Sequence, residues 1–283
     1  MMPDTRPSGS AISLRGVSIH FGEGPVAVQA LDEIDLDVSP GEFVSVLGPS
    51  GCGKSTVIGA IAGFTPISSG SLTVDLERVR SPGPDRGVVF QQHTLFPWKT
   101  AAANVEFGLK MRGLSKAECR RTAREVLTRV GLGEFANHYP HQLSGGMQQR
   151  INLARVLVNR PRVILMDEPF CSLDAQTRLQ MQQMLLELWQ ELHMTVVFVT
   201  HDVDEAIFLS DRVVVLTSRP GRIKGQLAVD LERPRDVGVL TCHEFVRLKR
   251  EALELLTSTA SAVDPRGLAS RASAWRARED LAT

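Results

Sequence analysis

The sequence predicts an α/β fold built around a mostly parallel sheet. Short apolar runs of strand length occur at 43–47, 163–166, 196–200 and 213–217, and runs of this kind are typical of strands buried on both faces. Helical patterns follow the first two runs, over 54–64 and over about 174–191. Strands that alternate with helices indicate a parallel sheet covered by helices.

Two features describe the N-terminal part. Residues 1–10 are rich in Pro, Ser and Gly, and we expect them to form a disordered leader. An apolar stretch at 12–19 and the alternating Ile34, Leu36 and Val38 follow. We interpret this region as an N-terminal antiparallel β subdomain, because alternation is typical of strands with one buried face.

Between the two strand–helix units, the stretch from about 93 to 160 is mainly helical in pattern. Ser115 and Glu118 fit a capping box, and Gly131 is a suitable terminator for that helix. Ser144 can cap a second helix, which Pro161 ends. We expect a helical subdomain inserted into the α/β core. A C-terminal extension, 231–283, is predicted to hold a helix over about 242–256 and then a disordered tail.

Composition limits the class of protein. The chain has 283 residues, of which 43% are hydrophobic, and 32 basic side chains balance 32 acidic ones. Zero net charge argues against nucleic acid as a partner. The four cysteines have no metal-like spacing, which favours a reduced, cytosolic protein. We find no apolar run of the ~20 residues that a membrane span needs, and no secretory signal.

The strongest motif is a glycine loop placed between a predicted strand and a helix. Such a loop turns successive N–H groups toward phosphate oxygens, while its lysine supplies a positive charge and the following hydroxyl binds Mg²⁺. The nucleotide-binding candidates in this segment are Gly48, Pro49, Ser50, Gly51, Cys52, Gly53, Lys54, Ser55 and Thr56.

A second motif follows the apolar run at 163–166. Asp167 stands at the carboxyl end of this predicted strand, where it can reach the same Mg²⁺. In an extended chain the adjacent Glu168 points to the opposite side, so we expect a separate role for it. Glu168 is the candidate that orients or deprotonates the attacking water.

A third motif, Leu143-Ser-Gly-Gly-Met-Gln-Gln-Arg150, begins at the predicted cap Ser144. Together with the glycine loop and the segment around Asp167, it resembles the ATP-binding subunits of ABC transporters over about residues 12–230. The resemblance implies an ABC ATPase domain at 11–230 with a RecA-like P-loop NTPase core and the helical signature subdomain at about 93–160. It also implies ATP and Mg²⁺ as ligands.

The same resemblance assigns further residues. Ser144, Gly145, Gly146 and Gln148 would complete the nucleotide site of a second copy of the chain, in a homodimer that sandwiches ATP. Four other positions match family motifs: Gln91 would link Mg²⁺ and water to the helical subdomain, His201 would contact the γ-phosphate, Phe21 would stack on adenine, and Asp174 would lie in the loop that connects the two sites. Gln91 and His201 are therefore catalytic candidates beside Glu168.

Local phrases resemble the nitrate/sulfonate/taurine import subgroup, among them 82–91, Leu95-Phe-Pro-Trp98 and 215–222. Two departures stand out, since Leu76 replaces a common hairpin glycine and the tail after about 257 has no counterpart. The subgroup implies a cytoplasmic subunit at the inner face of the cell membrane, bound to permease subunits and indirectly to a solute-binding protein. We expect Trp98 to help receive the permease; its alternative is packing within the subdomain.

The main alternative is a soluble ABC ATPase that acts on DNA or ribosomes. Such proteins usually carry coiled-coil insertions or tandem cassettes, and this sequence has neither. A P-loop GTPase would need an Asn-Lys-x-Asp selector, which is also missing. Co-sedimentation with membranes would separate an importer subunit from a DNA or ribosome factor. The sequence leaves the solute, the permease and the role of the tail open.

Overall fold

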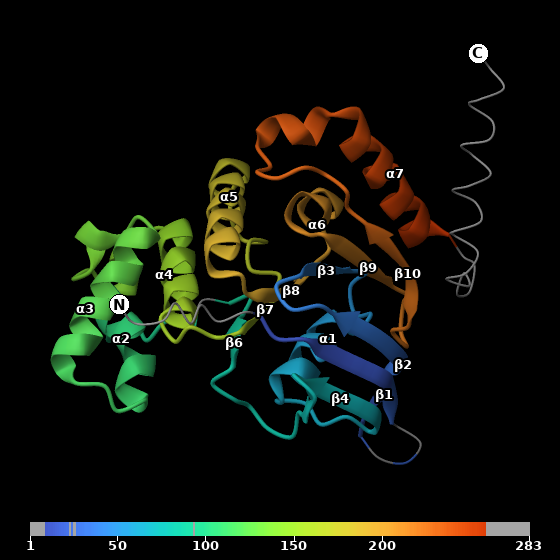
Figure 1. The fold of residues 1–283 in the computed structure, drawn as a ribbon, viewed down its shortest axis with the longest axis horizontal. Helices are drawn as coiled ribbons and strands as arrows, with labels where there is room; N and C mark the ends of the chain where they lie inside the picture. Colours follow the sequence, from blue (N-terminus) through green and yellow to red (C-terminus); the bar gives the residue numbers. More distant parts are fainter. Residues whose placement is uncertain (1–8, 23, 25–26, 93, 259–283) are drawn as a thin grey trace.

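The computed structural model describes residues 9–22, 24, 27–92 and 94–258. These residues form two sheets and an adjoining helical part (Figure 1). The chain runs in order through β1 (Ile12–Phe21), β2 (Val28–Val38), β3 (Phe43–Leu47), α1 (Lys54–Ala62), β4 (Ser69–Val74), β5 (Glu77–Arg78), β6 (Arg86–Val89), α2 (Ala101–Met111), α3 (Lys116–Arg129), η2 (Gly133–Phe135), η3 (Pro140–Gln142), α4 (Gly145–Leu157), β7 (Val163–Asp167), α5 (Ala175–Leu192), β8 (Thr195–Thr200), α6 (Val203–Leu209), β9 (Arg212–Leu216), β10 (Ile223–Ala228), η4 (Val237–Thr241) and α7 (His243–Thr257).

The larger sheet has the order β10-β9-β3-β8-β7-β6, and only the edge strand β10 is antiparallel to its neighbour. Its central strands are buried on both faces, as predicted from their continuous apolar runs. In β8, Val196 and Phe198 enter one core cluster while Val197 and Val199 enter the other. The predicted mostly parallel α/β sheet is confirmed.

The smaller sheet has the order β2-β1-β4-β5 and is antiparallel throughout, as expected for the N-terminal subdomain. Its apolar face shares a core cluster with α1 and with one face of the larger sheet. The predicted β4–β5 hairpin has no glycine in its turn. Asp75 and Leu76 adopt positive φ values of 49° and 68°, so two non-glycine residues take the left-handed conformation that such a turn requires.

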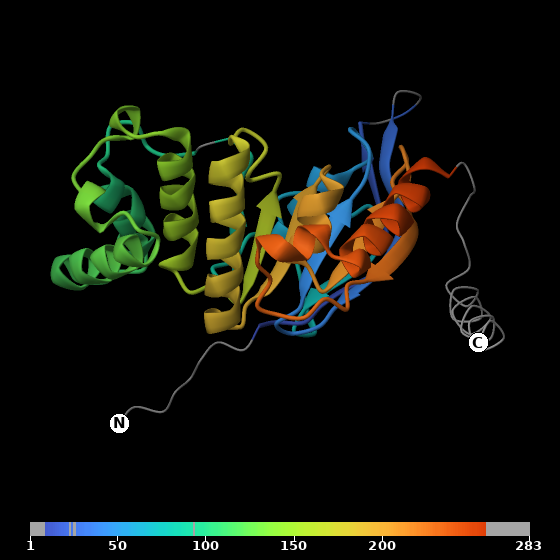
Figure 2. The same ribbon diagram turned by 90° about the horizontal axis from the view of Figure 1, so that it is seen from above.

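The helical part contains α2, α3 and α4 and lies beside the end of the larger sheet at β6 (Figures 1 and 2). The capping box of Ser115 and Glu118 is present at the start of α3, and Gly131 follows this helix with a φ of 73°. Ser144 caps α4 through the amide of Met147. Within the predicted range, the described residues before Ala101 form no helix.

The prediction of a disordered leader over residues 1–10 is wrong for its last two residues. Gly9 and Ser10, expected to be disordered, are packed: Ser10 is fully buried, and its carbonyl accepts a hydrogen bond of 2.7 Å from Thr195. Residues 1–8 and 259–283, which include nearly all of the predicted tail, lie outside the described residues. The C-terminal helix is present as α7, and its Phe245, Leu248 and Ala252 belong to the core cluster that also contains Phe43 of β3 and Val196 of β8.

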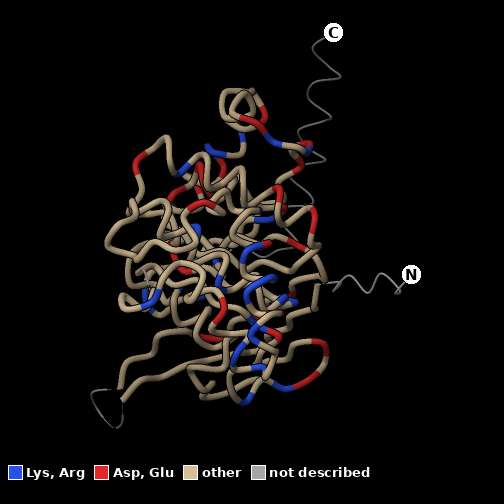
Figure 3. The backbone as a smooth tube through the Cα atoms, turned by 90° about the vertical axis from the view of Figure 1, so that its left-hand side faces the viewer, with Lys and Arg blue, Asp and Glu red and all other residues tan. Residues whose placement is uncertain are grey.

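The surface carries both signs of charge. Figure 3, which views the end with the helical part, shows basic and acidic positions interspersed along the chain. Among the described residues, no helix has the length and apolar character needed to cross a membrane. Cys52 and Cys119 are buried, whereas Cys171 is exposed and Cys242 is half-buried.

Candidate functional site

The glycine loop connects the buried strand β3 to α1, as the sequence predicts. Gly51 and Gly53 have φ values of 76° and 102°, a conformation that favours glycine. A Cβ atom on Gly53 would lie 2.6 Å from the Leu31 side chain and 2.9 Å from the Ala30 carbonyl oxygen. Among the residues that the structure describes, no side chain caps the N-terminus of α1. The first amides of this helix are therefore directed toward an anion-binding position.

Lys54 opens α1 and is only 6% exposed. Its Nζ donates to the carbonyl oxygens of Gly48 at 2.9 Å and Pro49 at 3.2 Å, and lies 3.6 Å from Oε1 of Glu168. The loop backbone and one carboxylate thus hold a buried ammonium group at the mouth of the glycine loop. A buried cation in this position suits a ligand with several negative charges.

Ser55 and Asp167 bring the first two motifs together. Ser55 Oγ donates a hydrogen bond of 3.0 Å to Oδ1 of Asp167, the last residue of β7. Burial is the main cause that raises the pKa of Asp167 above its ordinary value. Within the described residues, no group of three or more His, Cys, Asp or Glu side chains could bind a metal ion. The hydroxyl and carboxylate oxygens are the donors that Mg²⁺ prefers when phosphate and water supply its remaining ligands.

The backbone at Glu168 differs from the extended chain that we expected. Its φ is 44°, and its amide donates a hydrogen bond of 2.9 Å to the carbonyl oxygen of Val199 on β8. This conformation directs the carboxylate toward two basic groups from other elements. Oε2 lies 3.0 Å from Nδ1 of His201, while Oε1 faces Lys54. Glu168 and His201, predicted separately, are in direct contact.

A cavity of about 470 Å³ opens above the glycine loop. It contains Phe21, whose side chain is 48% exposed at the end of β1, together with Lys54 and Glu168. The remaining lining residues are Val28, Ala30, Ser50, Gly51, Gly53, Ser55, Thr56 and Arg219. An exposed aromatic ring at one end and a phosphate-type loop at the other can accommodate a nucleotide. The role of Phe21 in stacking remains a prediction.

The signature segment lies elsewhere, at the start of α4 in the helical part (Figure 1). A Cβ atom on Gly146 would lie 2.5 Å from Cγ2 of Thr177, so this glycine permits close contact with α5. Gln148, which we expected among the nucleotide-binding residues, uses its amide nitrogen to donate to the carbonyls of Pro140 and Leu143. Among the described residues, none of the segment lines the cavity around Lys54.

Gln91 and Asp174 have contacts that the sequence did not reveal. The amide nitrogen of Gln91 donates to Sγ of Cys171 at 3.4 Å, in the loop after β7. Asp174 caps α5 by accepting a hydrogen bond of 2.9 Å from the amide of Thr177, and this bond is the main cause that lowers the Asp174 pKa. Sequence reasoning missed Cys171 and Arg219 as neighbours of the site. Arg219 stands inside the phrase 215–222 that carried the resemblance, whereas Cys171 stands in none of the phrases.

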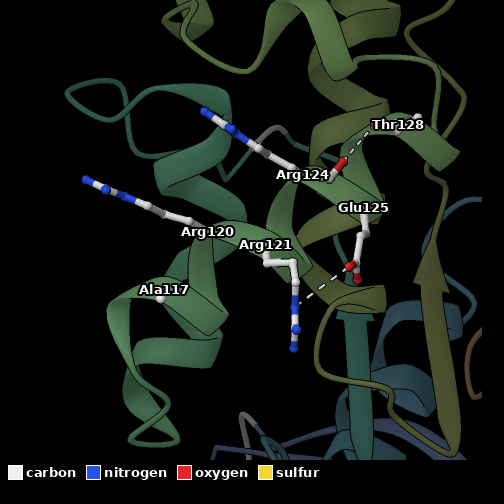
Figure 4. A pocket seen from close by; sticks show the side chains of 6 residues that line it. All are labelled: Ala117, Arg120, Arg121, Arg124, Glu125 and Thr128. Carbon is white, nitrogen blue, oxygen red and sulfur yellow. Dashed lines mark hydrogen bonds and ion pairs between the residues drawn. The ribbon is translucent and has the colours of Figure 1, made fainter.

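A larger surface cavity, of about 690 Å³, is not part of this site. It lies along the exposed side of α3 and is lined by Ala117, Arg120, Arg121, Arg124, Glu125 and Thr128 (Figure 4). Arg120 and Arg124 point outward, while Arg121 faces Glu125 at 3.9 Å. None of these residues belongs to the glycine loop or to the segment around Asp167.

A glycine loop with a buried lysine follows β3, and a serine–aspartate pair links this loop to the end of β7, two strands away in the sheet. These are the features of a P-loop nucleotide-binding site. The comparisons with known proteins give the family. The model described as "ABC transporter" matches residues 31–171. An uncharacterized ABC transporter ATP-binding protein of Methanocaldococcus jannaschii is 53% identical over 81% of this chain and 85% of its own length. The chain belongs to the ABC transporter family, as its motifs predicted.

Two relatives carry more specific names. The taurine import ATP-binding protein of Rhizobium johnstonii is 45% identical over 82% of this chain and 90% of its own. The nitrate import ATP-binding protein of a Synechocystis species is 50% identical over 72% and 77%. A bacterial ABC transporter cassette solved as a dimer has a TM-score of 0.70 and 36% identity, and covers 78% of this chain and 100% of its own. These likenesses confirm the predicted fold, and the names of the two relatives belong to the predicted subgroup.

Proposed function

We propose that this chain is the ATP-binding and ATP-hydrolysing subunit of an ABC importer. It would couple hydrolysis to uptake of a small oxyanion-type solute, of the nitrate, sulfonate or taurine class, through a separate permease. The observation that carries the proposal is the convergence of three predicted residues: Glu168 at the end of β7 contacts both Lys54 of the glycine loop and His201 after β8. The names of the taurine and nitrate import relatives support the choice of importer over a factor that acts on DNA or ribosomes.

The contacts suggest how the chain's residues divide the work. The glycine loop and Lys54 bind the phosphates, and Phe21 stacks on the base. Glu168 accepts a proton from the attacking water, and its contacts with Lys54 and His201 hold the carboxylate in position for this step. His201 orients Glu168 and faces the terminal phosphate. Ser55 and Asp167, which are in contact, would hold Mg²⁺ together with Gln91, and the metal would neutralise phosphate charge when bound.

We further propose that the working unit is a homodimer. Ser144 and the glycines after it are not among the residues that line this chain's own nucleotide cavity, so they are available to a second copy. A two-fold axis would place each signature segment over the partner's glycine loop, with Asp174 near the junction. Two cassette structures similar to this chain were solved as dimers, one of them bound to ADP and phosphate.

The permease would dock on the cleft between the helical part and β6. This cleft, of about 370 Å³, contains Phe90, Phe107 and Met111, of which Phe90 and Met111 are exposed. Phe96 packs on Phe107 and extends the apolar surface to Trp98. Docking there would hold the chain at the cytoplasmic face of the membrane, with a solute-binding protein reached only through the permease. The proposal includes no nucleic-acid partner.

Lys54→Ala tests the function directly. Loss of the ammonium group should abolish ATP binding or turnover while the fold is retained, because one charge faces several phosphate negatives. Lys116→Ala, which removes an exposed lysine from α3, is the matched control. A Lys54→Ala protein with a normal ATPase rate would refute the assignment of the site. Growth of a deletion strain on different nitrogen and sulfur sources would then identify the solute.

A further inference from the structure

The loop between β9 and β10, residues 217–222, contributes Arg219 to the lining of the nucleotide cavity. Its backbone is fastened to β2, since the Gly221 amide donates to Ala30 at 2.9 Å and the Asp32 amide donates to Gly221 at 3.0 Å. The Arg222 side chain donates from Nε to Oδ2 of Asp32 at 2.7 Å. These contacts fix the loop beside the residues that line the cavity near Phe21.

The same loop is pressed against the glycine loop. A Cβ atom on Gly221 would lie 2.1 Å from the carbonyl oxygen of Cys52, so only glycine allows this approach. Two residues earlier, Nε of Arg219 donates to the carbonyl oxygen of Gly51 at 3.3 Å. The guanidinium group therefore lies at the phosphate-binding loop, and it also lines the cavity.

Positively charged side chains outnumber negatively charged ones among the residues that line the cavity. Its charged lining residues are Lys54, Glu168 and Arg219, and the first two face each other at 3.6 Å. Arg222 is neutralised by Asp32. Within the described part of the chain, Arg219 makes no ion pair with a carboxylate, and its side chain is exposed. One permanently charged group thus enters the cavity without a counter-ion.

We propose that Arg219 is a nucleotide-positioning residue that binds the phosphate chain of ATP. The inference rests on the proposed function and adds a second cation to the one supplied by Lys54. A guanidinium group matches phosphate oxygens in geometry and charge. The contact with Gly51 favours the phosphates over the base as its target, because Phe21 lies at the end of β1 and Gly51 lies in the loop that receives phosphate.

Two substitutions separate this role from simple support of the loop. Arg219→Gln can still donate a hydrogen bond to Gly51 but carries no charge, and Arg219→Lys keeps the charge. Affinities for ATP, ADP and AMP would be measured by titration calorimetry on the full chain. Arg120→Gln on α3 is the matched control, because it removes an exposed arginine outside the site (Figure 4).

We expect Arg219→Gln to weaken ATP binding about ten-fold, the scale of one charged hydrogen bond. Its melting temperature without nucleotide should stay unchanged. Arg219→Lys should retain most of the affinity, AMP should be affected less than ATP, and added salt should lower ATP affinity less steeply in Arg219→Gln than in the unmodified chain. The Arg120→Gln control should bind like the unmodified chain.

Equal ATP affinity of Arg219→Gln and the unmodified chain would overturn the inference and leave the proposed function intact. A lower melting temperature of both Arg219 variants, with equal losses for ATP and AMP, would assign Arg219 to support of the loop and would also overturn it. Failure of the unmodified chain to bind ATP would instead overturn the proposed function, and the inference with it.

Discussion

Oγ1 of Thr200 donates a hydrogen bond of 2.5 Å to Oε2 of Glu205, which joins the last residue of β8 to the first turn of α6. The amide of Asp202 donates to the same hydroxyl at 3.0 Å. His201 lies between these anchors, so its backbone is held from both sides. The contact of His201 with Glu168 therefore depends on the buried hydrogen bond between Thr200 and Glu205.

Glu205 predicts a dependence of stability on pH. Burial is the main cause that raises its pKa, and Asp202 adds to the effect, while Thr200, Gln182 and Arg178 oppose it. The folded chain consequently binds this proton more tightly than the unfolded chain. The free energy of unfolding should therefore fall as pH rises from the unfolded pKa to the raised folded pKa, and the deficit should persist above it.

Glu205→Gln removes this titration and keeps an oxygen that can accept a hydrogen bond. We expect the variant to gain stability relative to the unmodified chain as pH rises from mildly acidic to neutral, by about 1 kcal/mol, the scale of favourable single substitutions. Urea denaturation at several pH values measures the difference. A constant difference across this range would show that the carboxyl does not titrate as its burial implies.

Much of the fold could be predicted because local rules and tertiary packing agree. The central strands are continuous apolar runs because both of their faces are buried, and Ser115 and Ser144 cap helices as their positions indicate. The P-loop, Ser55 and Asp167 could also be located, since a glycine loop between a strand and a helix can hardly form another structure.

The remaining features depend on contacts between distant segments. Ser10 is ordered by Asp75 and Thr195, which lie far along the chain, so its polar composition predicted the wrong state. Glu168 takes a left-handed conformation because β8 binds its amide. Arg219 reaches the site only because β9 lies beside β3 in the sheet. No periodic pattern or short motif in the sequence indicates these contacts.

The turn of the β4–β5 hairpin stores strain that a substitution should release. Leu76 has a φ of 68° and is 94% exposed. The left-handed conformation of its backbone is therefore unfavourable in free energy, and burial of the side chain does not offset this cost. Leu76→Gly should raise the free energy of unfolding by about 1 kcal/mol, because glycine avoids the clash of Cβ in this conformation. Urea denaturation checks the value.

Leu76→Ala is the control for this gain. Alanine removes the same apolar surface but keeps Cβ, so it should give no stabilisation. Asp75 at the preceding position should not be changed in the same experiment, since its carboxylate accepts hydrogen bonds from Ser10 and Ala11 and pairs with Arg162. Equal stability of the glycine and alanine variants would show that the turn is unstrained.

Trp98 tests the proposed permease surface. The residue is 71% exposed, so most of its side chain does not pack within the helical subdomain, and its one aromatic contact among the described residues is Phe96, with the ring centroids 5.6 Å apart. Trp98→Ala should weaken association with the permease by ten-fold or more, as truncation of a central aromatic anchor does, in the range of about 2 kcal/mol. ATP binding by the isolated subunit should be unchanged.

Co-purification of the subunit with its permease, beside ATP titration of the subunit alone, measures both effects. Val246→Ala, which removes an exposed apolar side chain from α7, serves as the control. Normal assembly of Trp98→Ala with the permease would show that the permease docks on another surface. Lost ATP binding without an assembly defect would point to a structural role.

Glu168 joins catalysis to assembly. Glu168→Gln keeps the shape of the side chain and an oxygen that His201 can approach, but it removes the base. Because general-base catalysis contributes about 10²–10⁴-fold, phosphate release should fall by that factor. ATP should still bind, since Lys54, Ser55 and Asp167 are unchanged. Each retained ATP would then join one P-loop to the signature segment of a second chain, and the variant should accumulate as an ATP-dependent dimer.

Size-exclusion chromatography with and without ATP measures the dimer, and a phosphate-release assay measures the loss of hydrolysis. Undiminished phosphate release would remove Glu168 from the mechanism, whereas slow release by a protein that stays monomeric in ATP would count against the composite site.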